Sequence, residues 1–180
     1  LYLSIDNVSV PSNDMLEEDP ISAAIFSNAK RLGENVFLTC DALKKIVVFN
    51  FRDRCILYKD YPMGLEQCVD FIIKDDILYF LSFYGDVYCY NMTRGEWNSL
   101  SVHGDKLEFG RLLVTDSNIC LLPCQGNDIV IYDIAGKEFY RYDEYPEDFV
   151  YALRYPGMAK FFGRCEDDDW YYMAMCAQNY

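Results

Sequence analysis

The sequence predicts an all-β protein that is built from repeated four-stranded antiparallel units. Two observations predict this fold class. Strand-length segments rich in Tyr, Phe, Val and Ile alternate with Gly, Asn, Asp and Pro along the 180 residues. Short motifs also recur about every 42 residues. The composition, 52% hydrophobic and 17% aromatic, provides for a packed core and argues against a disordered chain.

The clearest motif is a strand that ends in Asn or Asp and is followed six residues later by a large apolar side chain. The polar residue recurs at intervals of 41 and 42 residues, as Asn50, Asn91 and Asp133. The apolar residue recurs with it, as Ile56, Trp97 and Phe139. Because these matches and the prolines at 20, 62 and 146 share one register, chance does not explain them.

The middle unit shows the four predicted strands best, as "CVDFII", "ILYFLSF", "VYCYN" and "EWNSLSV". We expect the Asn91 side chain to accept a hydrogen bond from the backbone amide two residues on, which closes the turn into the fourth strand. Trp97 is expected to pack against the neighbouring unit. Cys89 holds the same repeat position as Val48 and Ile131, so it is expected to be a buried core residue.

Four-stranded units at this spacing are typical of a β-propeller. The stretches "DVYCYNMTRGEWNSL" and "DIVIYDIAGKEFYRY" resemble kelch-type blades, in which a Trp follows the third strand at the same distance. The resemblance covers three units, roughly residues 21–145. The Gly-Gly that kelch blades carry after the second strand is replaced here by "TCDAL", "SFYGD" and "PCQGN". The resemblance implies a kelch-like propeller repeat.

We expect residues 1–180 to form one propeller domain or an excerpt of one. The register predicts that 1–19 end a blade, that 20–61, 62–103 and 104–145 are three complete blades, and that 146–180 are a partial blade. Two arrangements fit this division. The chain is either a partial ring from a larger propeller or a small four-bladed ring.

The charge and the rare residue types exclude several classes of function. A formal net charge of −13 disfavours nucleic-acid binding, which needs Lys and Arg against phosphates. No apolar run reaches the roughly 18 residues of a membrane helix. The eight cysteines form no CxxC pair and there is one histidine, so we expect no metal site and no cofactor. We expect the cysteines to be free thiols in a reducing compartment, which predicts a cytoplasmic location.

Catalytic candidates are few, and the sequence predicts a protein that is not an enzyme. The single histidine, His103, lies in a predicted loop, which favours a solvent-exposed residue over a general base. The acidic run at Asp167, Asp168 and Asp169 is a weak calcium candidate that lacks EF-hand spacing. The two Asn-x-Ser/Thr patterns, at Asn7 and Asn91, fall on the turn position and need no glycan.

Carboxylates crowd the loops that join the second and third strands of a blade and the loops that join blades, which lie on one face of an antiparallel meander. We therefore predict a non-enzymatic module that binds a basic protein partner through this acidic face, with tyrosines as anchors. Glycan binding or processing, and a structural scaffold role in a larger assembly, are the alternatives. The predicted partner-binding residues are Asp60, Tyr61, Asp86, Asp105, Asp128, Asp143, Glu144, Tyr145, Glu147, Asp148 and Tyr155.

Overall fold

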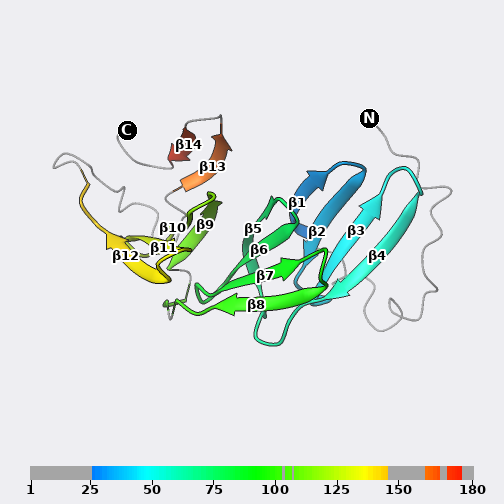
Figure 1. The fold of residues 1–180 in the computed structure, drawn as a ribbon, viewed down its shortest axis with the longest axis horizontal. Helices are drawn as coiled ribbons and strands as arrows, with labels where there is room; N and C mark the ends of the chain where they lie inside the picture. Colours follow the sequence, from blue (N-terminus) through cyan, green and yellow to red (C-terminus); the bar gives the residue numbers. More distant parts are fainter. Residues whose placement is uncertain (1–25, 103, 107, 146–160, 167–169, 176–180) are drawn as a thin grey trace. The chain divides into compact units, whose positions relative to one another are not determined.

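A computed structural model describes residues 26–102, 104–106, 108–145, 161–166 and 170–175, and the regular structure in these ranges is all β-strand (Figure 1). Three antiparallel sheets have four strands each, in chain order, and a fourth sheet has two. The predicted fold class is therefore confirmed. Within the described residues, no helix is long and apolar enough to cross a membrane.

The strands of the first sheet are β1 (Phe26–Leu32), β2 (Asn35–Cys40), β3 (Lys45–Asn50) and β4 (Cys55–Asp60). Those of the second are β5 (Cys68–Lys74), β6 (Ile77–Ser82), β7 (Val87–Asn91) and β8 (Glu96–Leu100). The third sheet contains β9 (Phe109–Val114), β10 (Asn118–Pro123), β11 (Ile129–Asp133) and β12 (Glu138–Tyr142). The last pair is β13 (Phe161–Glu166) and β14 (Tyr171–Met175).

The chain divides into two compact units, Leu1–Cys68 and Val69–Tyr180. The first sheet belongs to the first unit. The other sheets belong to the second, apart from Cys68 at the start of β5. The two-stranded sheet matches the predicted strands "KFFGRC" and "WYYMAMC", so the described residues do not contain the four complete blades of a small ring. The predicted blade end at 1–19 and the predicted strand "DFVYALRY" lie outside the described residues.

The polar residue that ends each third strand caps the following turn. Its side-chain oxygen accepts a backbone N–H, from Asp53 to Asn50 at 2.8 Å, from Arg94 to Asn91 at 2.8 Å and from Ala135 to Asp133 at 2.9 Å. The prediction of a cap is thus confirmed. Only Asp133 accepts from the amide two residues on, as expected. In the other two turns the side-chain oxygen accepts from the amide three residues on.

The six-residue spacing arises from the register of the hairpin that the cap closes. The residue just before the cap lies directly opposite the residue six after it, as Phe49 opposite Ile56, Tyr90 opposite Trp97 and Tyr132 opposite Phe139. The ring centroids of the last two pairs are both 4.9 Å apart. The repeat motif therefore encodes one apolar cross-strand pair per sheet, the main unit of sheet stabilisation.

Trp97 also belongs to a row of rings across the second sheet. Its centroid lies 5.5 Å from that of Phe80, which stacks on Phe71 at 5.6 Å and an interplanar angle of 13°. These contacts and the pair with Tyr90 all lie within one sheet. The predicted contact of Trp97 with a neighbouring blade stays a prediction.

In the second unit, an apolar core fills the space between the second and third sheets. Leu81 and Val87 from the second sheet and Phe109, Leu112 and Leu121 from the third belong to one buried cluster. On the other face of the third sheet, Phe161 of β13 packs with Leu113 and Leu122. The third sheet is therefore covered on both faces, as expected for a blade between two neighbours.

One turn of the second sheet is a residue shorter than its counterpart in the first. Asn35 lies opposite Asn50, and four residues connect Cys40 to its partner Lys45. In the second sheet Asn91 lies opposite Ile77 rather than Asp76, and the amide of Ser82 donates to the carbonyl of Asp86 across three residues. The shortened turn accounts for the spacing of 41 rather than 42 between Asn50 and Asn91.

Cys89, predicted to be buried, is partly buried and packs against the core, and its replacement by Val is expected to leave the fold intact. Cys89 is a free thiol, and it packs against the main cluster of the second unit. Burial raises the pKa of the Cys89 thiol from 9.0 to about 11. The folded state then holds this proton more tightly than the unfolded state, so stability is complete below pH 9 and falls as pH rises toward 11.

We therefore expect Cys89→Val to match the natural protein in urea unfolding at pH 8 and to exceed it by about 1 kcal/mol at pH 10. The comparison isolates Cys89, because every other titrating group is common to both proteins. Equal stability of the two proteins at pH 10 would show that the thiol is not buried in solution.

Candidate functional site

The loop end of the third sheet is organised around Glu108. Its backbone carbonyl accepts the amides of Cys124 at 2.7 Å and Gly126 at 3.1 Å, both from the β10–β11 loop. One side-chain oxygen accepts the amide of Asp105 at 2.8 Å, and the other accepts Nη1 of Arg141 at 3.2 Å. A single residue thus ties the inter-sheet connection, the β10–β11 loop and β12 together.

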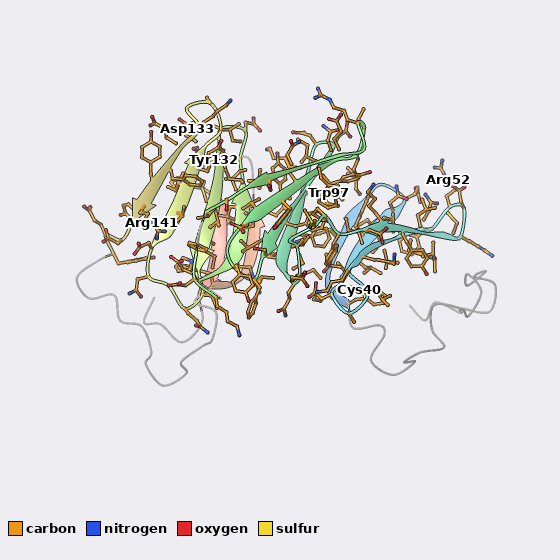
Figure 2. The ribbon with its side chains drawn as sticks, turned by 90° about the horizontal axis from the view of Figure 1, so that it is seen from below. Cys40, Arg52, Trp97, Tyr132, Asp133 and Arg141 are labelled. Carbon is orange, nitrogen blue, oxygen red and sulfur yellow. The ribbon has the colours of Figure 1, made fainter. Side chains whose placement is uncertain are left out.

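Arg141 extends this network to a second carboxylate. Its Nη1 also donates to Oδ2 of Asp128 at 3.2 Å, so one guanidinium bridges Glu108 and Asp128. The hydrogen bond to Glu108 raises the pKa of Arg141, and the cation is permanent. Figure 2 shows Arg141 at the end of the sheet opposite the turn that holds Asp133. We call Asp105, Glu108, Asp128, Arg141, Asp143 and Glu144 the acidic loop cluster.

Two glycines allow the loops to approach this closely. A Cβ on Gly126 would lie 2.6 Å from Cγ of Glu108 and 3.1 Å from its carbonyl oxygen. Gly85, in the β6–β7 turn, has a φ of +86°, and a Cβ there would lie 2.9 Å from the Phe109 ring. Larger residues at either place would push the loops apart.

Asp86 fixes the chain that leads from the second sheet to the third. Its Oδ1 accepts the hydroxyl of Ser101 at 2.9 Å and the amide of Val102 at 3.1 Å. This half-buried carboxylate therefore orients the connection that carries Asp105. Tyr145, which follows β12, donates its hydroxyl to the carbonyl of Asn127 at 2.8 Å and so fastens the chain to the β10–β11 loop.

In the first unit, predicted site residues lie at the end of the first sheet where β4 ends. Asp60 forms an ion pair with Lys45, whose hydrogen bond and charge lower the pKa of the Asp60 carboxyl. Tyr61 donates its hydroxyl to Oδ1 of Asp41 at 3.1 Å, and that oxygen also accepts the amide of Cys68 at 2.9 Å. Burial is the main reason that the pKa of Tyr61 is raised, so this phenol stays neutral.

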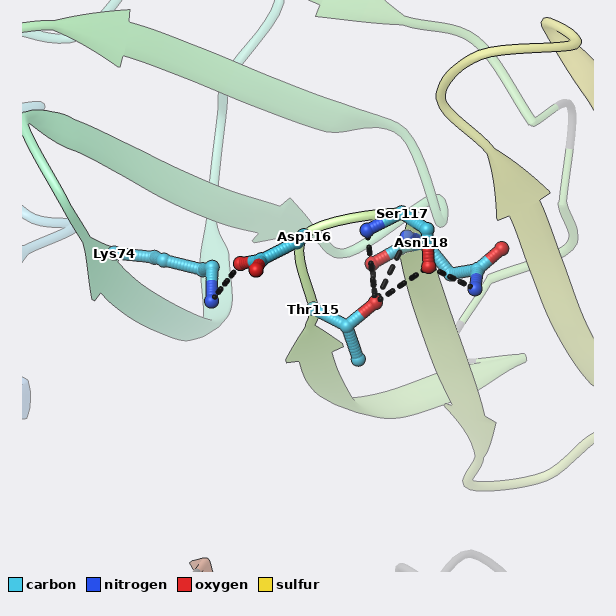
Figure 3. Close-up of polar contacts among 5 residues, drawn as sticks. All are labelled: Lys74, Thr115, Asp116, Ser117 and Asn118. Carbon is cyan, nitrogen blue, oxygen red and sulfur yellow. Dashed lines mark hydrogen bonds and ion pairs between the residues drawn. The ribbon is translucent and has the colours of Figure 1, made fainter. Parts of the chain in front are cut away.

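At the opposite end of the strands in the second unit, a lysine links the second sheet to the third through an ion pair. Lys74, at the end of β5, pairs with Asp116 of the β9–β10 turn at 2.7 Å (Figure 3). The hydrogen bond from Lys74 lowers the pKa of Asp116. Thr115 closes this turn, since its hydroxyl accepts the amide of Asn118 at 2.8 Å.

The predicted partner-binding residues thus differ in whether their side chains already have partners within the protein. Five of them make contacts within their own unit: Asp60, Asp86, Asp128, Tyr61 and Tyr145. Three others are exposed, and their carboxylates form no ion pair with the described residues: Asp105, Asp143 and Glu144. The other predicted residues lie outside the described part of the chain: Glu147, Asp148, Tyr155, His103 and Asp167 to Asp169. Within the described residues, no group of three His, Cys, Asp or Glu could hold a metal ion.

Sequence reasoning missed Glu108, Arg141 and the exposed Tyr84. Glu108 directly precedes a buried strand, and Arg141 stands between two tyrosines in the strand "EFYRY". A cation between two aromatic residues of a predicted strand was the available signal. Its two partners lie 13 and 33 residues away in the sequence, and no local pattern joins them.

No protein-family model matches the sequence, and no curated protein matches it. Similar solved structures include the computationally designed protein Ika4, with a TM-score of 0.59, 12% identity, 84% of this chain covered and 86% of that chain. BamB from Moraxella catarrhalis has a TM-score of 0.56 and 10% identity, over 84% of this chain and 41% of its own. Streptogramin B lyase has a TM-score of 0.54 and 13% identity, over 68% and 43%.

These structures are of the propeller type, and at such identities the likeness shows the fold alone. The chain spans less than half the length of BamB and of streptogramin B lyase. None of the three is a kelch-specific relative, so the resemblance is shown for the propeller type and not for the kelch family. One of them is by its name a lyase, so the fold does not separate enzymes from other proteins.

Proposed function

We propose that the chain is a non-enzymatic interaction module whose acidic loop cluster binds a basic segment of a partner protein. The observation that carries the proposal is the network around Glu108 and Arg141, which holds three acidic connections at one end of the third sheet. Five carboxylates and one guanidinium make up the cluster, so its charge is strongly negative. Such a surface attracts a cationic partner and excludes an anionic one.

The exposed members of the cluster are the ones that would contact the partner. Asp105, Asp143 and Glu144 are solvent-exposed, whereas Glu108 and Asp128 are occupied by Arg141. The two occupied carboxylates position the loops, which lowers the entropy cost of presenting the three exposed ones. The exposed Tyr84, two residues before Asp86, adds an aromatic surface of the kind that anchors protein interfaces.

A short Lys/Arg-rich peptide is the probe for this proposal, with its Asp/Glu-rich counterpart as the negative control. We expect micromolar-range binding that weakens with salt, because exposed charges are screened. Asp105→Asn with Glu144→Gln should weaken binding about fivefold, at roughly 0.5 kcal/mol for each exposed charge. The measurement is isothermal titration calorimetry at two salt concentrations.

The matched control removes the same charge from the hairpins that join the third and fourth strands of the first and second sheets, with Asp53→Asn and Glu96→Gln. This protein should bind the peptide as the natural one does. Equal weakening by both double variants would mean that only net charge matters, which contradicts the proposal. Failure to bind the basic peptide, together with binding on a glycan array, would favour the glycan alternative.

A further inference from the structure

The outermost strand of the third sheet, β12, is an edge. In the described residues it pairs with β11 alone, and all five of its residues are exposed. Three of these residues are aromatic, Phe139, Tyr140 and Tyr142. Natural sheets usually protect such an edge with charges, Pro or a covering segment, because an open apolar edge pairs with other chains.

The hydrogen-bonding groups of β12 alternate in direction. The amide of Ile134 donates to Ser117, which places the backbone groups of Ile134 and every second residue of β11 toward β10. The residues between them, Asp133, Ile131 and Ile129, then face β12, where their partners are Glu138, Tyr140 and Tyr142. The backbone N–H and C=O groups of Phe139 and Arg141 therefore point outward from the sheet.

The side chains of β12 are complementary to those of a second β12 strand related by a two-fold axis. In an antiparallel pair of two β12 strands centred on Tyr140, Phe139 would lie opposite Arg141 of the other copy. Their outward backbone groups would then meet in two hydrogen-bonded pairs. Lys137, the turn residue just before β12, would lie near Asp143, the residue just after β12 of the other copy, and neither side chain forms an ion pair with the described residues. The stem of Arg141 offers the opposing Phe139 ring an apolar surface.

The outer strands of the other two sheets lack this combination. Around the corresponding centre of β8, Gly95 would lie opposite Ser101, so no charges are matched. Around Leu57 in β4, Arg54 would lie opposite Asp60, but Asp60 is already paired with Lys45 of its own sheet. Charge complementarity without a competing partner is thus particular to β12.

We propose that β12 pairs antiparallel with β12 of a second copy of this chain, about a two-fold axis at Tyr140, and joins the two third sheets into one. The interface is isologous, so each contact occurs twice. It is small, and a weak association in roughly the micromolar to millimolar range is expected. It does not depend on the proposed binding of a basic partner.

The test is sedimentation equilibrium of the natural protein and of variants across that concentration range. The natural protein should show a monomer–dimer equilibrium. Tyr140→Lys should weaken dimerisation at least about tenfold, because it places two cations against each other at the axis. Leu57→Lys is the matched control at the corresponding place in β4; the two side chains are 51% and 59% exposed, and the control should dimerise normally.

A charge exchange provides a second test that does not depend on one variant. Lys137→Glu and Asp143→Lys should each weaken dimerisation, and the protein carrying both should recover it, because the opposite charges meet again. Circular dichroism of each variant confirms that it is folded. A natural protein that stays monomeric at every concentration overturns the proposal. So does a dimer that Tyr140→Lys leaves unchanged or that the double exchange does not restore.

Discussion

Phe109→Ala is expected to destabilise the second unit by about 3–5 kcal/mol, the range for truncating a fully buried aromatic residue. Phe109 is 1% exposed and belongs to the cluster that joins the second and third sheets. Its ring also supports the loop end, since it lies against the backbone of Gly85. Its removal therefore leaves a cavity in the core and removes support from the loops above.

Urea unfolding followed by tryptophan fluorescence measures the loss, with Phe139→Ala as the control. Phe139 is 43% exposed on an outer strand, so its truncation should cost less than about 1 kcal/mol. Phe109→Leu should fall between the two, because most of the volume is kept. Similar costs for Phe109→Ala and Phe139→Ala would contradict the placement of Phe109 between the sheets.

Asp70→Ala should cost the second unit about 2–3 kcal/mol, which is the penalty for leaving a buried donor without its charged acceptor. Asp70 is only 5% exposed, and its Oδ2 accepts the amide of Leu112 at 3.0 Å. Leu112 lies one repeat, 42 residues, further along the chain. In the described residues β9 is the inner edge of its sheet, and Asp70 supplies an acceptor for this amide.

Asp70→Asn distinguishes the hydrogen bond from the charge. The amide oxygen can still accept from Leu112, so we expect this variant to lose less than half as much as Asp70→Ala. Chemical denaturation and amide exchange at Leu112 are the two measurements. Should Asp70→Ala stabilise the unit, the desolvation of the buried carboxylate would exceed the benefit of its hydrogen bond, and this account of Asp70 would be wrong.

The fold was predictable because its signals are local. Asn91, Trp97 and Cys89 each reveal their position through the chain around them, since the turn cap, the cross-strand pair and the core position recur with a fixed spacing. The four strands of the second sheet followed from alternation and turn residues, and their observed bounds differ from the predicted ones by at most two residues.

The candidate site was predictable only in part, because its contacts join residues far apart in sequence. Asp86 and Asp128 were expected to be free for a partner. Instead they bond Ser101 and Arg141, which sit on strands or connections that only the folded sheet brings near. A count of carboxylates predicts the sign of the charge on a surface. It does not predict which of those charges form ion pairs within the sheet.

The sheet connectivity bears on how the chain folds as it is synthesised. Every four-stranded sheet consists of consecutive strands, so each hydrogen-bonded neighbour is the next strand in the chain. Such contacts close short loops and cost little chain entropy, which favours rapid folding for a β protein. A sheet can thus form soon after its fourth strand leaves the ribosome, while the Asp70–Leu112 bond must wait for β9. We expect the last strands made to limit the rate at which the second unit matures.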